Sequence, residues 1–352
     1  MRTDEDLVRW YRHLGLCALA MTVLLGATLR WTLAGAGWPS WLGQWAHVRS
    51  AHSHLGYYGV LFPLMWAAWA RMGLRAPGRV ALAVYAFATA AACIDFARHG
   101  YAALSIAGST VVLGTWFLTS LSMARLLFRR DWLATAAPAI WLACVAIPAV
   151  AVLSARGDPL ATPMVRAFLT WLLLGVVLST SLRQAGAPAP PPWLHVPMVV
   201  GAGLALGPWP HPLTHALLAG YGALLLVTVA RMRATLTTRA LWAVLGAGFV
   251  VVAAGRLGEQ HLVAIAGIHF AVLGPVMVSA AWPRAWAPAL PAYAAAVALF
   301  SLAIVGPLLA PWAGWQRASA VIGTVIAALW VVRGVGSALR FHFAPTAEGA
   351  TS

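Results

Sequence analysis

The sequence contains no lysine and very few acids. All 23 of its basic residues are arginines, only 8 of its 352 residues are acidic, and charged residues make up 9% of the chain. The net charge of +15 is spread over short polar segments between apolar runs, whereas a nucleic-acid-binding protein gathers its basic residues into one patch. We therefore expect no nucleic acid partner, and we attribute the charge to arginines that collect in cytoplasmic loops.

Cysteine is equally scarce. Cys17, Cys93 and Cys144 lie far apart inside apolar runs, so the sequence has neither a Cys-x-x-Cys motif nor a disulfide framework. Without paired cysteines or grouped carboxylates, the sequence disfavours a structural zinc site and an oxygen-ligated calcium site. Imidazole is therefore the main side chain left that could hold a metal.

Apolar sequence, in contrast, is abundant. Hydrophobic residues make up 62% of the chain, the mean hydropathy is +0.81, and apolar runs of about 20 residues recur from end to end. Strands of a membrane barrel would alternate with period two, so we expect an all-α, polytopic integral membrane bundle in contact with lipid. The predicted spans are residues 14–34, 47–70, 79–97, 101–124, 132–153, 163–182, 193–209, 212–230, 240–255, 261–282, 287–310 and 316–339.

The arginines predict the orientation of this bundle. With the N-terminus in the cytoplasm, most of the arginines fall in cytoplasmic segments, which favours an even number of spans, about 12, with both termini cytoplasmic. We expect a multi-pass protein of the cell inner membrane, formed by residues 1–352 as one bundle domain. A proline-rich stretch, residues 186–192, would act as a stiff cytoplasmic linker between halves 1–185 and 193–352.

Histidines are the polar residues that enter the apolar runs. Three of them lie about a third of the way into a predicted span, where an unpaired polar group is costly and a functional role is the default. Each is followed five residues later by glycine, a residue that lets either a neighbouring helix or a flat porphyrin approach the backbone. These pairs are His54 with Gly59, His215 with Gly220, and His269 with Gly274.

Helical geometry relates these histidines to others nearby. At about 100° per residue, His52 and His54 face opposite ways, whereas His47 shares a face with His54 and His211 shares one with His215. Neutral imidazole binds iron, copper and zinc well. We therefore predict a cofactor held among His52, His54, His215 and His269. The histidines nearer the span ends, His47, His211 and His261, are additional candidate metal ligands.

Acidic residues are nearly absent from the predicted inner halves of the spans. Glu259 and Asp95 lie toward the outer face, near the histidines, and are the candidate points of proton uptake. Two simpler roles compete with this one, since Asp95 could pair with Arg98 three residues on and Glu259 could be a solvated loop residue. The distribution predicts that any reduction draws its protons from the outer face without pumping them.

The segment from Trp45 through His52-Ser-His54-Leu-Gly-Tyr-Tyr-Gly59 resembles the His-x-His-x-x-x-x-Gly signature of the NnrS family. The run from His215 to Gly222, closed by Arg231, is similar to a later segment of that family. This sequence differs at Leu55, where the family usually has glutamate, and lacks the Gly-His-Thr-Gly-Arg tail after Arg231. The resemblance implies a twelve-helix membrane protein with heme and copper, linked to the nitric-oxide response and related to heme-copper oxidases.

The leading hypothesis is a membrane protein that binds heme b, alone or together with copper, in the outer half of its bundle and interacts with a diatomic gas such as nitric oxide or oxygen. One alternative is a b-type cytochrome that only passes electrons, with two histidines on each heme. Another is a transporter that carries a metal ion or proton along its histidines, although such a protein would continue its polar groups toward the cytoplasm. The sequence identifies neither a catalytic residue nor an electron donor.

Overall fold

The computed structural model describes residues 5–255, 261–310, 312 and 314–343, and within these ranges helices are joined by turns and loops, without strands. The longer helices are α1 (Glu5–Leu33), α2 (Trp45–His54), α3 (Phe62–Arg71), α4 (Arg79–His99), α5 (Ala103–Leu121), α6 (Ala136–Ala155), α7 (Ala161–Trp171), α9 (Pro192–Leu206), α10 (Pro212–Arg231), α11 (Leu236–Gly255), α12 (His261–Ala271), α14 (Leu290–Leu309) and α15 (Gly314–Phe343). Shorter pieces extend several of them: η4 (Trp132–Thr135), α8 (Ser179–Gln184), α13 (Met277–Ala280) and η8 (Arg284–Ala289). The expected all-α class is confirmed for this part of the chain.

Ten helices in the described ranges are long and apolar enough to cross a membrane, which makes the chain a multi-pass membrane protein. Two predicted spans are not among the ten. The second, now α2 through α3, is one continuous helical stretch whose histidines, serines and arginines dilute its apolar residues. The seventh, α9, has 15 residues and is about 22 Å long, short of a hydrocarbon core of about 30 Å.

Contacts divide the chain into two compact units. Unit 1 comprises residues 1–71, 77–112 and 316–352, and unit 2 comprises residues 72–76 and 113–315. In unit 1, α1 packs on α3 and α2 packs on α4. Gly15 allows α1 to approach α3 closely, because a Cβ at this position would come within 2.8 Å of Leu64.

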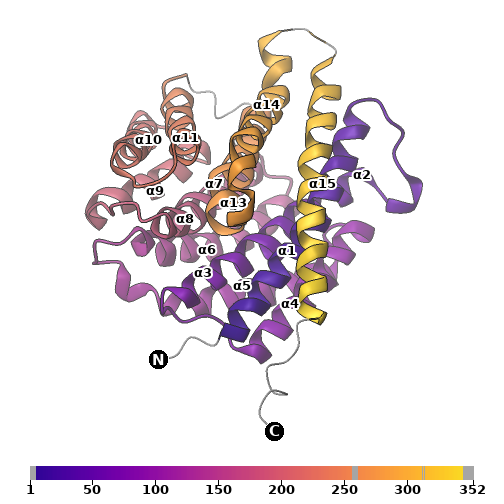
Figure 1. The fold of residues 1–352 in the computed structure, drawn as a ribbon, viewed down its shortest axis with the longest axis horizontal. Coiled ribbons are helices and arrows are strands. Elements are labelled where there is room, and N and C mark those ends of the chain that lie inside the picture. The colour runs from indigo at the N-terminus through magenta and orange to yellow at the C-terminus, as the bar shows by residue number, and fades with distance from the viewer. Residues whose placement is uncertain (1–4, 256–260, 311, 313, 344–352) are drawn as a thin grey trace. The chain divides into compact units, whose positions relative to one another are not determined.

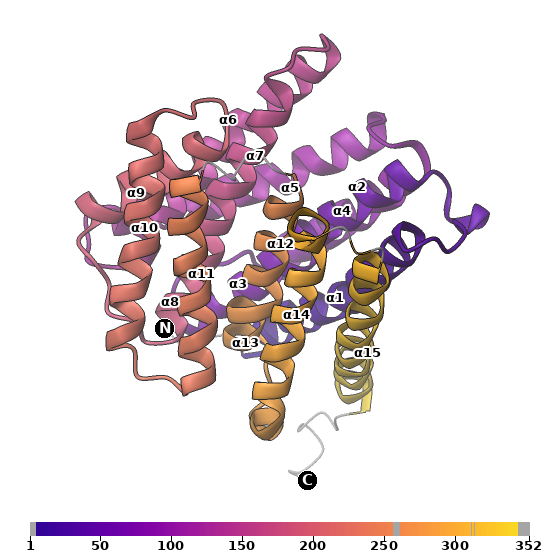
Figure 2. The same cartoon turned by 90° about the horizontal axis from the view of Figure 1, so that it is seen from above.

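Unit 2 contains the helices from α6 to α14 and the second half of α5, whereas α15 lies almost entirely in unit 1. In this unit α6 packs on α7, α7 on α9, α9 on α10, α10 on α11 and α12 on α14. Helices α10 and α11 form a pair that lies side by side in both Figure 1 and Figure 2. The span Ala161–Gln184 is the most buried of the ten. In its most apolar 18-residue stretch, 78% of the residues are buried, against 28–39% in the other spans.

Three helical stretches change to π-helical hydrogen bonding partway along, and the third does so across a backbone kink at Gly274. The π-helical segments are η2 (Leu55–Leu61), η5 (Leu172–Leu178) and η7 (Val272–Val276). The ten spans, the stretch from α2 through α3 and helix α9 make twelve segments in chain order. The π-helical changes fall in the second, sixth and tenth of these segments, so they recur every fourth segment. Since π-helical insertions frequently occur at functional sites, the recurrence directs attention to the residues around them.

Candidate histidine site

His54 is the last residue of α2, immediately before the π-helical segment η2. Its Nδ1–H donates to the carbonyl of Ser50 at 2.7 Å, so in the neutral ring Nε2 carries the lone pair. The imidazole stacks on Phe96, with ring centroids 3.9 Å apart and planes 21° apart. The edges of Tyr58 and Tyr101 complete an aromatic enclosure at centroid distances of 5.2 and 5.8 Å.

His52 lies on the opposite side of the same helix, as its spacing from His54 predicts. Its Nδ1–H donates to the carbonyl of Thr22 in α1 at 2.9 Å. The ring packs directly on Gly26, where an added Cβ would lie 2.9 Å from the imidazole Cε1. The two histidines therefore present their rings to different neighbours, α1 for His52 and the end of α4 for His54.

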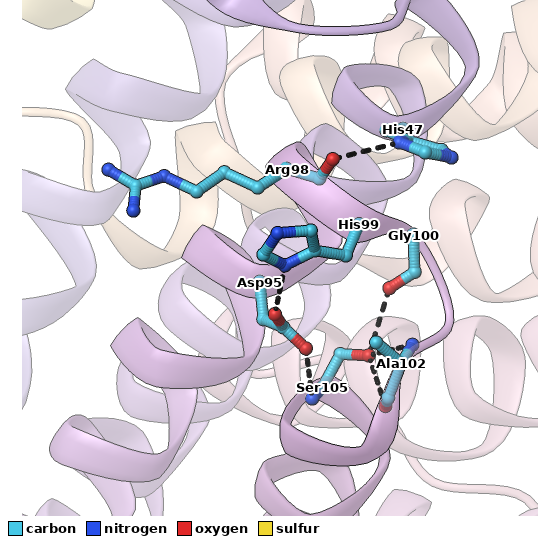
Figure 3. A network of polar contacts seen from close by, with 7 residues as sticks. All are labelled: His47, Asp95, Arg98, His99, Gly100, Ala102 and Ser105. Atoms are coloured by element: carbon cyan, nitrogen blue, oxygen red, sulfur yellow. Dashed lines mark hydrogen bonds and ion pairs between the residues drawn. The ribbon is translucent and has the colours of Figure 1, made fainter.

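His47 lies on the same side as His54, which confirms the predicted shared face. Its Nδ1–H donates to the carbonyl of Arg98 at 3.3 Å. Its ring rests against Gly100, where φ is +70° and a Cβ would lie 2.9 Å from the imidazole. Figure 3 shows the hydrogen bond between His47 and the Arg98 carbonyl, beside the turn between α4 and α5.

A polar network joins the end of α4 to the start of α5. Asp95 is only 7% exposed; its Oδ1 accepts from His99 Nδ1 at 2.7 Å and its Oδ2 accepts from the backbone N–H of Ser105 at 2.8 Å. Ser105 Oγ contacts the carbonyls of Gly100 and Ala102 at 2.9 and 2.8 Å. In Figure 3 the Arg98 guanidinium points away from Asp95, so the expected pairing with Arg98 is wrong.

His99 is a functional candidate that sequence reasoning missed. Its side chain is 65% exposed while its Nδ1–H is held by the buried carboxylate, an arrangement that leaves Nε2 on the outside. The spacing of four residues between Asp95 and His99 on one helix was the available signal. It was overlooked because Arg98, at a spacing of three, carries the stronger charge.

In unit 2, His211 is not a residue of a helical face. It precedes α10 in an extended conformation, and its Nδ1 accepts from the backbone N–H of Leu213 at 3.2 Å as an N-cap. The predicted shared face with His215 is therefore wrong. His215 lies in the first turn of α10, and its buried Nδ1 has no hydrogen-bond partner among the described residues.

His269 also lies in unit 2, three residues before the π-helical segment η7. Its Nδ1–H donates to the carbonyl of Ile265 at 2.8 Å, and its ring meets the edge of Phe300 at a centroid distance of 5.7 Å. His261 begins α12, but its side chain lies outside the described residues, as does Glu259 altogether.

The glycines that follow the deep histidines make ordinary packing contacts. A Cβ at Gly59 would lie 2.8 Å from Ala18, and one at Gly220 would lie 3.0 Å from Met198. Gly274 differs, because its ψ of −106° is non-helical and it precedes Pro275 at a kink. Close helix packing therefore explains Gly59 and Gly220, and a backbone bend explains Gly274.

The candidate ligands divide between the two units. His47, His52, His54 and Asp95 belong to unit 1, whereas His211, His215 and His269 belong to unit 2. In the described ranges no group of three or more histidine, cysteine, aspartate or glutamate side chains could hold a metal ion by itself.

The Asp95 network gives a first testable prediction. Asp95→Ala leaves the Ser105 backbone N–H without its acceptor in a buried position, so we expect a fall in the unfolding temperature of about 2–4 °C. His99→Ala keeps that acceptor and removes an exposed partner, so its effect should be smaller. Thermal unfolding of both variants in detergent measures the difference; equal shifts would contradict a role for Asp95 in joining the two helices.

Comparison with known proteins adds no relative. No protein-family model matches the chain, and neither a curated protein nor a solved structure matches it. The class of protein, a multi-pass helical membrane protein, is therefore defined by its fold, and its function has to be argued from the histidines themselves.

Proposed function

We propose that the protein is a twelve-span protein of the cell inner membrane, with both termini in the cytoplasm, that binds heme b and through it a diatomic gas such as nitric oxide or oxygen. The observation that carries the proposal is His54, whose Nδ1 is tied to the Ser50 carbonyl directly before a π-helical segment. His269 repeats the arrangement in the other unit, with Nδ1 tied to Ile265 before η7.

The donor set fits heme better than a metal ion bound by protein alone. A histidine that donates Nδ1–H to a carbonyl is fixed in orientation and is more basic at Nε2, the nitrogen that binds iron in heme proteins. Porphyrin supplies four nitrogen ligands of its own, so one or two histidines suffice. A copper ion without porphyrin would need a larger cluster, and the described residues contain none. Copper is therefore a companion of heme in this proposal and not a replacement for it.

Each residue of the enclosure has a defined task. Ser50 sets the ring orientation of His54, and Phe96, Tyr58 and Tyr101 keep water from its face. Heme held there would supply an iron atom able to bind the gas. Asp95 and His99 are the proposed proton-uptake point on the outer face, because a buried carboxylate holds an exposed imidazole.

An absorption spectrum tests the proposal. Protein purified from cells supplied with heme should show a Soret band, and carbon monoxide should shift that band in the reduced protein. A Soret band that ignores carbon monoxide would favour the electron-passing cytochrome. Folded protein that contains no heme, iron or copper would overturn the proposal and leave the transporter as the alternative.

A further inference from the structure

The start of α1 and the end of α3 lie together in unit 1. Gly15 of α1 faces Leu64 of α3, and four residues earlier the ring of Tyr11 meets that of Trp66 at a centroid distance of 5.9 Å. The two helices therefore run in opposite directions along each other. The Tyr11 hydroxyl also donates to the carbonyl of Pro77, so the chain just before α4 is held against α1. These contacts fix the backbone from which the side chains at this end of unit 1 extend.

Two arginines extend from this end, Arg12 from α1 and Arg71 from the last position of α3. The Arg71 Nε–H donates to the carbonyl of Ala67 at 3.1 Å, one turn back, which holds the side chain back along α3. The positive charge of Arg12 lies close enough to disfavour the charge of Arg71. Arg12 is half-buried and Arg71 is exposed, so a molecule from outside the protein can reach the pair.

No acid balances this pair within the described residues. Asp6, the acid that forms ion pairs at this end, contacts Arg9 and Arg79 instead, and neither Arg12 nor Arg71 takes part in an ion pair of the described chain. Two like charges held near each other repel, and an anion between them turns this repulsion into attraction. A phosphate group fits such a pair well, because guanidinium groups bind phosphate oxygens through two parallel hydrogen bonds.

We propose that Arg12 and Arg71 bind the phosphate group of an anionic phospholipid. Their depth favours a lipid over free phosphate, because Arg12 precedes the predicted span 14–34 and Arg71 follows the predicted span 47–70, at the boundary between hydrocarbon and headgroups. Trp10, on the same part of α1, is 45% exposed, as aromatic residues at that boundary are. Basic sites between membrane helices hold anionic headgroups in this way. Only the assignment to the cytoplasmic leaflet rests on the proposed topology.

Thermal unfolding and native mass spectrometry of the delipidated full-length protein in detergent test the site. Phosphatidylglycerol added to the micelles should raise the unfolding temperature until the effect saturates, and the mass spectrum should show a retained lipid. Phosphatidylcholine at the same mole fraction should do much less, because its choline group neutralises the phosphate charge. Inorganic phosphate at the same concentration and ionic strength should not reproduce the effect. Equal effects of the two lipids, or saturation by inorganic phosphate alone, would overturn the proposal.

Single substitutions separate a defined site from diffuse attraction. Arg12→Gln and Arg71→Gln each remove one guanidinium and should weaken phosphatidylglycerol binding by about tenfold. Arg71→Lys keeps the charge but not the paired hydrogen bonds, so it should lose part of the affinity. Arg9→Gln is the matched control, since it removes the same charge from the same helix but its guanidinium pairs with Asp6, and it should keep the wild-type affinity. Equal loss in all three glutamine variants would overturn the proposal.

The lipid site and the heme proposal stand or fall separately. The lipid assays use neither heme nor a gas, and neither arginine touches His54 or its aromatic enclosure. Protein without a Soret band could still bind phosphatidylglycerol, and heme-containing protein could fail to do so.

Discussion

Replacing His54 with alanine is expected to reduce the heme content of the purified, folded protein by about tenfold or more, because the variant loses the imidazole proposed to bind iron. The Ser50 carbonyl and the aromatic rings of Phe96 and Tyr101 stay in place, so the enclosure itself should persist. The ratio of Soret absorbance to protein absorbance measures the change.

His99→Ala is the matched control for that variant. It also removes an imidazole from unit 1, but this ring is exposed and bound to Asp95, so the heme content should stay at the wild-type level. Wild-type heme content in His54→Ala would show that another histidine is the ligand. His52→Ala and His269→Ala then identify which one, because both rings have the same Nδ1-to-carbonyl arrangement.

Gly175→Ala is expected to lower the free energy of unfolding by about 1–3 kcal/mol, the usual range for an overpacked core. The added methyl group would meet Ala139 and the backbone of Thr135, neither of which can rotate away as a flexible side chain can.

Gly248→Ala serves as the comparison, since a Cβ at Gly248 would meet no atom within 4 Å. Alanine has the higher helix propensity by about 1 kcal/mol, so this variant should be as stable as the wild type or more so. Denaturant unfolding in detergent compares the two. If Gly175→Ala is no less stable than Gly248→Ala, the close approach of α6 to η5 is not a constraint on the fold.

The sequence predicts the angular relations of histidines well where the helix is regular. His47, His52 and His54 all lie within α2, and their directions follow from 100° per residue. The prediction failed at His211, because an N-cap residue leaves the helix and its side chain turns back onto the backbone. A proline at the first helical position, Pro212, is the signal that places this boundary.

The π-helical segments could not be predicted from periodicity. A π-helix adds one residue to a turn without any characteristic residue type, and sequences such as Leu-Leu-Leu-Gly-Val-Val-Leu in η5 read as uniformly apolar. The hydroxyl contact between Thr135 and Ser179 could not be predicted either, since it depends on the close approach of the chain at Gly175.

The bond between Asp95 and the start of α5 bears on how the chain enters the membrane. Helices α4 and α5 form a hairpin whose turn is only three residues long, from Gly100 to Ala102. Within that hairpin the Asp95 carboxylate accepts hydrogen bonds from the His99 imidazole and from the Ser105 N–H. The Ser105 hydroxyl donates to the Gly100 carbonyl. A hairpin with its polar atoms already bonded to one another exposes fewer of them to hydrocarbon during translocation. The two helices can therefore insert together as a preassembled pair.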